Sequence, residues 1–198
     1  MWRKPGKRNP FRFLISHSSA FFLILPQIEP DMHDLRITWV QTSLAWEEPE
    51  TNLRNLSALL EDCPETDLIL LPETFNTGFS INPERCAEPP GGPSSLFLRN
   101  LAVTRQCAVA GTLITKEQAG YFNRLHFYFP DGSLETYDKR HLFRLSEEYR
   151  IFRGGSERKV IRYRNWNILP LVCYDLRFPV WSKNRYMNGT YEYDFMFY

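Results

Sequence analysis

The sequence contains few of the residues from which metal sites are built. It has four histidines and four cysteines among 198 residues, with no CxxC pair and no HExxH motif. A glycine-rich phosphate loop is also absent. The missing metal motifs argue against a metallohydrolase, and we expect no metal and no other cofactor.

An excess of charge of one sign is lacking as well. The formal net charge is +1 at pH 7. Residues 1–31 hold five basic and two acidic residues, leaving 19 of the 24 basic and 21 of the 23 acidic residues for the remainder. A nearly balanced surface gives no reason to expect a nucleic-acid partner.

No apolar run is long enough to span a membrane securely. Residues 1–31 nevertheless differ from the rest, because a basic start and the apolar run 20–25 imitate a signal peptide without a small-residue cleavage site. We expect an over-long translation start with Met32 as the true initiator, and an export signal is the alternative. The predicted domain then occupies residues 32–198.

Apolar periodicity predicts strands alternating with helices, hence an α/β sheet layered by helices. Strands are expected over residues 35–41, 67–72, 107–114, 122–130, 134–137, 159–163, 166–172 and 193–198, and helices over 49–62 and 94–105. Residues 82–93 and 142–156 are predicted loops, and the turn 131–132 makes 122–137 a hairpin.

Three reactive side chains follow three of these strands. Glu73 comes after the first apolar run, Lys139 after the hairpin and Cys173 after the last long strand. Because α/β proteins usually carry their chemistry at strand ends, these groups are expected to converge at one rim.

Together the three groups suit acyl transfer through a thioester. A thiol reacts as the thiolate, so Glu73 would remove the proton of Cys173 as a general base. Lys139 would favour the thiolate and then hold the oxyanion, helped by the backbone N–H of Tyr174. Each residue alone has an ordinary explanation: a buried cysteine, a turn carboxylate and a solvated basic residue.

A reactive thiol bears on where the protein resides. Four cysteines could form two disulfides in an exported protein, but a working thiol favours the reducing cytoplasm, which we predict. The four are Cys63, Cys86, Cys107 and Cys173.

The residues around the three groups resemble a known family. Residues 71–75, 137–143 and 173–179 are similar to the three signature blocks of the nitrilase (carbon–nitrogen hydrolase) superfamily. Residues 76–80 and the Arg-Phe-Pro after the cysteine block are most like its omega-amidase branch. The resemblance spans residues 34–198.

This resemblance implies a four-layer α-β-β-α sandwich and a triad of Glu73, Lys139 and Cys173. A second glutamate often assists, and of the two adjacent candidates the distance to the following glycine pair favours Glu148. Arg177 is a candidate ligand for a substrate carboxylate, with a structural salt bridge an equal alternative.

The implied reaction converts 2-oxoglutaramate to 2-oxoglutarate and ammonia. Rivals within the superfamily are hydrolysis of a nitrile, an N-carbamoyl group or deaminated glutathione. Full-length relatives are expected to be homodimers. By comparison with them the sequence ends early, inside the strand 193–198, so an inactive truncated product is a further alternative.

Overall fold

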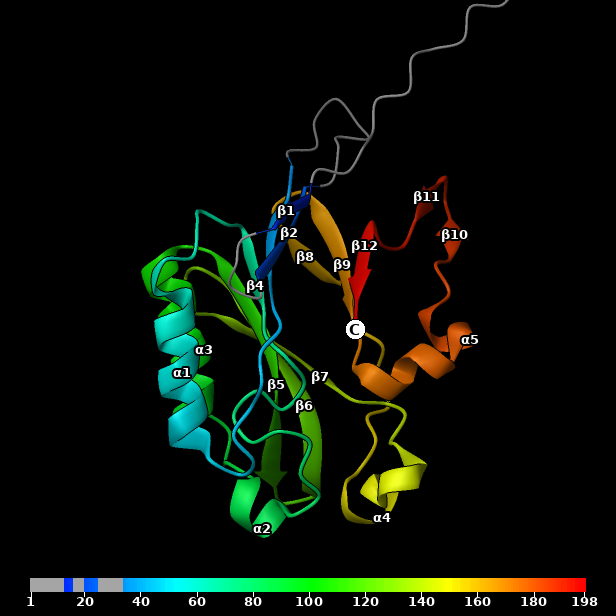
Figure 1. Ribbon diagram of the computed structural model, residues 1–198. Coiled ribbons are helices and arrows are strands. Elements are labelled where there is room, and N and C mark those ends of the chain that lie inside the picture. The colour runs from blue at the N-terminus through cyan, green and yellow to red at the C-terminus, as the bar shows by residue number, and fades with distance from the viewer. Residues whose placement is uncertain (1–12, 16–19, 25–33) are drawn as a thin grey trace, which may run out of the picture.

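The computed structural model describes residues 13–15, 20–24 and 34–198, which form a mixed α/β structure (Figure 1). Met32, the expected initiator, and most of residues 1–31 lie outside the described residues. Within the described part, no helix is long and apolar enough to cross a membrane.

Seven strands form the larger sheet in chain order, β1 to β7. Their bounds are β1 Phe13–Ile15, β2 Ala20–Ile24, β3 Arg36–Val40, β4 Leu68–Leu70, β5 Ala108–Glu117, β6 Gly120–Tyr128 and β7 Leu134–Asp138. β3, β4 and β5 pair in parallel, and β6 and β7 each reverse direction. β4 and β7 therefore run the same way, and their carboxyl ends reach the same rim.

A second sheet has the order β12–β9–β8. Its strands are β8 Ile161–Tyr163, β9 Trp166–Pro170 and β12 Phe195–Phe197, and a separate small hairpin joins β10 Tyr186–Met187 to β11 Thr190–Tyr191. The helices are α1 Pro49–Glu61, α2 Pro83–Cys86, α3 Pro93–Arg105, α4 Glu148–Ile151 and α5 Pro179–Ser182, with 3₁₀ turns η1 Arg144–Ser146 and η2 Cys173–Arg177.

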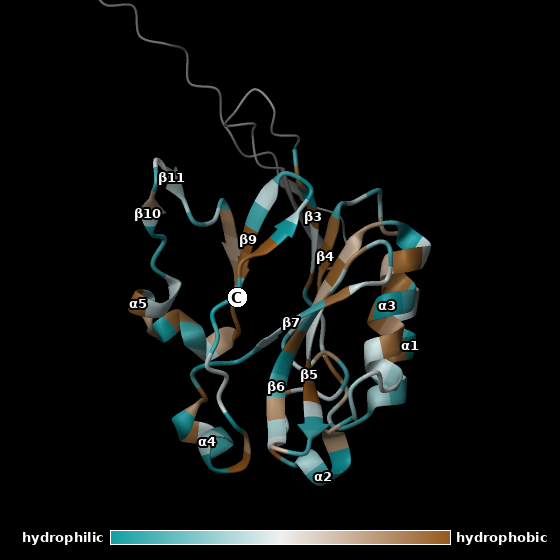
Figure 2. Ribbon diagram, turned by 180° about the vertical axis from the view of Figure 1, so that it is seen from behind, coloured by the Kyte–Doolittle hydropathy of each residue, from teal (hydrophilic) through white to brown (hydrophobic). Residues whose placement is uncertain are grey.

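Both faces of β4 are buried, which explains why this strand is apolar throughout. Leu68 and Leu70 join a core cluster that includes Ile168 of the second sheet, whereas Ile69 faces the opposite way and packs with Leu98 of α3. Each such side chain contributes roughly 2 kcal/mol by leaving water. In Figure 2 the brown, hydrophobic parts of α1 and α3 alternate with teal ones, as expected for helices with one buried face.

The structure confirms both expected long helices, and it adds elements that the sequence pattern did not reveal. α2 lies inside the predicted loop 82–93, and η1 and α4 lie inside the predicted loop 142–156. β5 continues beyond residue 114 because its polar end pairs with β6, through the register Glu117–Gly120. Thr115 is still buried, and cross-strand pairing sustains the exposed end of that extension.

The N-terminal strands extend the sheet beyond β3. β2 pairs antiparallel with β3 from Ala20–Val40 to Ile24–Arg36, and β1 pairs with β2. The backbone groups on that side of β3, which would otherwise form a sheet edge, are therefore paired.

A histidine lies deep beneath α3. His126 of β6 is 2% exposed, with Nδ1 3.1 Å from the Ser95 hydroxyl and Nε2 3.4 Å from that of Thr115. Burial, and to a smaller extent the charge of Arg124, lowers its pKa to about 4. The folded protein therefore holds this imidazole neutral.

This burial predicts a specific acid sensitivity. Below pH 6.5 the unfolded chain binds a proton at His126 that the folded chain refuses until about pH 4, so stability falls as the pH drops through this window. The slope from this group approaches about 1.4 kcal/mol per pH unit. Urea unfolding followed by tryptophan fluorescence at several pH values should show a shallower decline for His126→Gln. An unchanged decline would contradict the prediction.

Candidate active site

Cys173 lies in a sharp turn directly after the second sheet. The preceding Leu171 and Val172 are 1% and 2% exposed, whereas Cys173 reaches the surface. Its φ is +39°, in the left-handed region that costs a non-glycine residue about 1–3 kcal/mol. Such strain persists only where the surroundings enforce it, and here the chain passes from an extended segment into η2.

The surroundings that enforce the turn centre on Asp175. Its fully buried carboxylate accepts hydrogen bonds from the Val172 N–H at 3.1 Å and from the Tyr137 hydroxyl at 2.7 Å. The backbone N–H of His141 donates to it at 2.9 Å, and His141 Nδ1 lies 2.7 Å away. Tyr137 and His141 flank Lys139 in sequence, so one carboxylate fastens the cysteine turn to the lysine segment.

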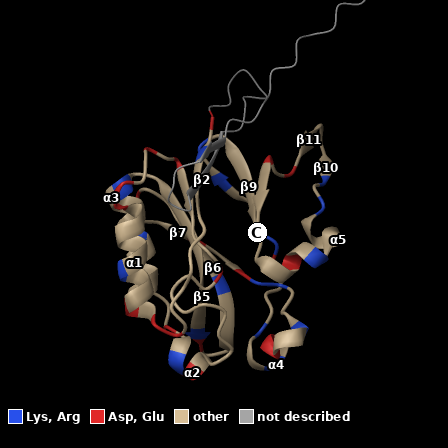
Figure 3. Cartoon of the chain, in the orientation of Figure 1, with Lys and Arg blue, Asp and Glu red and all other residues tan. Residues whose placement is uncertain are grey.

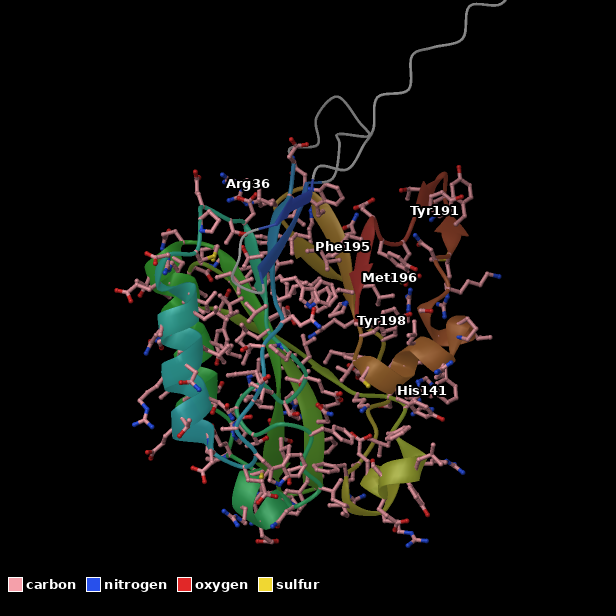
Figure 4. All side chains as sticks on the ribbon, viewed as in Figure 1. Arg36, His141, Tyr191, Phe195, Met196 and Tyr198 are labelled. Carbon is pink, nitrogen blue, oxygen red and sulfur yellow. The ribbon has the colours of Figure 1, made fainter. Side chains whose placement is uncertain are left out.

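The ring of His141 is itself held by aromatic packing. It stacks on Phe178 with ring centroids 3.7 Å apart and meets Trp181 edge-on, and Figure 4 shows it next to α5. Trp181 Nε1 also donates to the Tyr137 hydroxyl at 3.0 Å. The turn after Cys173 and the segment around Lys139 therefore form one packed unit.

Glu73 follows β4 and is likewise fixed by a strained turn. The next residue, Thr74, has φ +46° and is buried, and its N–H donates to the Thr112 hydroxyl at 2.6 Å. The Thr74 carbonyl accepts from the N–H groups of Thr77 and Gly78. A positive φ is rare for a β-branched residue, so this turn is enforced by its hydrogen bonds.

Lys139 is completely buried between two carboxylates. Its Nζ lies 2.8 Å from Glu73 Oε1 and 3.0 Å from Glu148 Oε2, and the ring of Phe79 lies below it at 5.2 Å. Burial alone would lower the pKa of Lys139, but the two carboxylates outweigh it and raise the pKa. The side chain is a fixed cation.

Of the two adjacent glutamates, Glu148 contacts Lys139. Glu148 begins α4, is 1% exposed and also accepts a bond from the Phe143 N–H, whereas Glu147 pairs with Arg150 at the surface. The two glutamates are adjacent in sequence, yet one is buried and the other lies at the surface. Figure 3 shows the acidic (red) start of α4. Glu147, with φ +65°, forms the bend that sends them apart.

The thiol of Cys173 is held protonated in this arrangement. Although the residue is exposed, partial loss of water around the thiol is the main cause, and the charge of Glu73 adds to the effect, so the pKa of Cys173 is raised to about 11. Lys139 acts in the opposite direction, as expected, but does not prevail. The thiol therefore rests protonated, beside a cavity that Glu73 also lines.

A cavity of about 530 Å³ opens beside Glu73 and Cys173. Most of its wall is apolar and comes from both sheets: Trp39, Val40, Leu70, Leu71, Pro72, Ala110, Gly111, Leu125, Leu171, Val172 and Phe197, with Gln41, Thr42, Thr112 and Tyr198 as further polar groups. None of its lining residues is a lysine or an arginine. Arg177 is exposed at the end of η2 and lies outside this lining.

Tyr174 occupies the second position of η2, and the role of its N–H remains a prediction. Its ring packs edge-on against Phe143 and Phe178, at centroid distances of 5.1 and 5.6 Å. These contacts hold the residue that follows the thiol against the segment between Lys139 and Glu148.

Sequence reasoning missed Asn123 and the part played by Asp175. Asn123 lies inside β6 and donates to both Glu73 and Glu148. A polar residue within a strand was the signal for Asn123. Asp175 was noted only as part of a polar turn, and its partners are 34 and 38 residues away.

The electrostatics predict how one substitution at Glu73 changes the pH at which the Cys173 thiol reacts. Glu73→Gln removes the charge and the acceptor that raise the Cys173 pKa, so iodoacetamide should alkylate Cys173 with a midpoint below pH 11 by roughly one unit or more. Peptide mass spectrometry against pH measures this midpoint. Glu147→Gln, on the surface next to the site, is the matched control and should leave it in place. A midpoint that stays at the wild-type value in Glu73→Gln would refute the assignment.

The sequence of this chain is similar to those of several known proteins. The carbon–nitrogen hydrolase family matches residues 36–190. The omega-amidase YafV of Yersinia enterocolitica is 42% identical over 154 residues, which are 78% of this chain and 60% of that protein. A 2-oxoglutaramate amidase of Bacillus subtilis is 26% identical over 158 residues, 78% of this chain and 61% of that protein.

The fold of this chain also matches a solved structure. The crystal structure of a CN-hydrolase superfamily protein from Xanthomonas campestris, with an arsenic adduct in its active site, superposes with a TM-score of 0.81 at 42% identity. The match covers 83% of this chain and 64% of that one, so the chain spans about three fifths of the length of these relatives. The resemblance drawn from the three sequence blocks is confirmed, and the chain belongs to the carbon–nitrogen hydrolase family.

Proposed function

We propose that this protein is an omega-amidase-type hydrolase that cleaves the terminal amide of a small 2-oxo acid amide, such as 2-oxoglutaramate. The observation that carries the proposal is the ion pair of Glu73 with the Lys139 ammonium beside a cavity that Glu73 and Cys173 both line, in a chain 42% identical to an omega-amidase. The family membership supports an amidase, and the choice of acid rests on the relatives' names.

The proposed reaction begins with proton transfer from Cys173 to Glu73 as the sulfur attacks the amide carbon. The carbonyl oxygen becomes an oxyanion, which Lys139 and the Tyr174 N–H stabilise. The carbon–nitrogen bond then breaks, and the proton on Glu73 goes to the leaving nitrogen to give ammonia. The acyl group remains on Cys173 as a thioester.

Water completes the cycle. Glu73 accepts a proton from the water as its oxygen attacks the thioester carbon, the carbon–sulfur bond breaks, and the proton returns to the sulfur. Glu148 Oε2 also lies 3.0 Å from Lys139 Nζ, so Glu148 balances the charge of the ammonium group while Glu73 changes protonation state. The fixed cation keeps both carboxylates in place throughout.

A second candidate is an amidase or related enzyme for an uncharged acyl group. The largely apolar cavity without lysine or arginine in its lining favours this reading, since the carboxylate of a 2-oxo acid amide would need a cation. Arg177, placed outside the lining, would then have a structural role. A panel of 2-oxoglutaramate, a neutral aliphatic amide, a nitrile and an N-carbamoyl compound separates these substrates.

Several further properties complete the proposal. Residues 32–198 would be part of a four-layer α-β-β-α sandwich, cytoplasmic, and homodimeric in full-length relatives. The two packed sheets with α1 and α3 on one outer face support three of these layers. A 198-residue chain that folds cooperatively but turns over no member of the panel would favour the inactive alternative.

Nucleophilic catalysis predicts the effect of removing one sulfur. Cys173→Ser should lower ammonia release at least about a thousandfold, because serine lacks a comparably acidic group. Cys63→Ser, which changes a partly exposed thiol next to Thr38 at 3.5 Å, is the control and should keep activity within about twofold. A glutamate dehydrogenase-coupled ammonia assay measures both. Full activity in Cys173→Ser would rule out the mechanism.

A further inference from the structure

We propose that Asn123 is a positioning residue that holds Glu73 and Glu148 together through a single amide group. Asn123 Nδ2 lies 2.8 Å from Glu73 Oε1 and 3.2 Å from Glu148 Oε1. The residue is 2% exposed and belongs to β6, outside the three sequence blocks. The inference rests on the proposed catalytic roles of these carboxylates.

The sheet places Asn123 beside the lysine. The backbone carbonyl of Asn123 accepts the N–H of Lys139 at 2.9 Å, so the two residues are neighbours where β6 and β7 end their pairing. Main-chain and side-chain bonds thus come from the same residue. The position of the amide is therefore set by the sheet, which is more rigid than a loop.

The charges explain why an amide suits this position. Glu73 and Glu148 are two carboxylates with Lys139 as the cation that both contact, and that cation is fully buried. The Asn123 amide adds hydrogen-bond donation to both anions without adding charge. A second lysine would neutralise the cluster, and an aspartate would add a third anion.

The orientation of the amide is determined by the same contacts. Asn123 Oδ1 is buried and has no hydrogen-bond partner in the described part of the chain, whereas Nδ2 serves both carboxylates. A flipped amide would place Oδ1 against two carboxylate oxygens and lose both bonds. Burying Oδ1 without a hydrogen-bond partner costs free energy, and this cost accompanies the orientation in which Nδ2 donates to both carboxylates.

The consequence for Glu73 is a defined orientation. Both Lys139 and Asn123 donate to the same oxygen, Oε1, which leaves Oε2 outside these two bonds. Glu73 and Cys173 also line the same cavity. The partial positive charge on Asn123 Nδ2 therefore offsets part of the negative charge of Glu73, a charge that opposes ionisation of the Cys173 thiol.

A double-mutant cycle on thiol reactivity tests this role without requiring turnover. Iodoacetamide alkylation of Cys173 at about pH 8 is followed by peptide mass spectrometry in four proteins: wild type, Asn123→Leu, Glu73→Gln and the double variant. Asn123→Leu should slow alkylation about threefold or more in the wild-type background. In the Glu73→Gln background the same substitution should change the rate by less than about 1.5-fold.

The matched control is Asn52→Leu. Asn52 is 1% exposed and bonds to backbone groups of Ala45 and Asn76, with no carboxylate among these partners. It should leave the alkylation rate within about 1.5-fold of wild type, even though it costs stability. Should Asn123→Leu fail to fold, Asn123→Ser, whose side chain is too short to bridge both carboxylates, replaces it in the cycle.

An equal slowdown in both Glu73 backgrounds, no slowdown at all, or the same loss in Asn52→Leu would overturn the proposal. Should wild type release no ammonia from any amide while the cycle shows coupling, the proposed function fails and this inference stands. In an active enzyme, Asn123→Leu should lower kcat about tenfold and leave KM within about twofold, because Asn123 acts through Glu73 and not on the substrate.

Discussion

A fully buried ammonium group organises this structure. Lys139 has no exposed surface, and removing an unpaired charge from water costs several kcal/mol, so its site must contain anions. Glu73 and Glu148 supply them, from segments 66 residues before and 9 residues after the lysine. The requirement to neutralise one cation thus brings together the residues whose chemistry the protein is proposed to use.

Cys173, the proposed nucleophile, is joined to this cluster by a second buried acidic side chain. Asp175 binds the turn of Cys173 to the residues on either side of Lys139, which keeps the strained cysteine next to Glu73. Breaking a hydrogen bond to a buried carboxylate costs more free energy than breaking one between neutral groups, because an unpaired buried charge remains. Strain at Thr74 and Cys173 is tolerated for the same reason: both turns are fastened at several points.

Local sequence patterns predicted much of this arrangement. The apolar run before Glu73 and the helices α1 and α3 were visible because strand and helix periodicity are encoded over a few residues. The placement of Glu148 against Lys139 agrees with the preference for it over Glu147. Asn123 and the partners of Asp175 could not be foreseen, because their meaning depends on pairing between distant segments. The four-residue helix α4 was not predicted either, because a helix this short is stabilised by its contacts with other segments and not by its own length.

The charged cluster and the cavity beside it differ in chemical character. The charged cluster is built within the described chain, whereas the cavity beside it is largely apolar and has no cationic lining. Acyl transfer chemistry and acyl specificity are therefore distinct questions here. Under the proposed function, the first would depend on Cys173 and its neighbours, and the second on groups that contact the far end of the substrate.

The central claim is that an acyl group is transferred to the sulfur of Cys173. Rapid acid quenching during turnover, followed by peptide mass spectrometry, measures this directly. The account predicts the mass of the acyl group on the peptide that contains Cys173, removable by hydroxylamine. Ammonia release with no such adduct, or with the adduct on Cys63, Cys86 or Cys107, would contradict it.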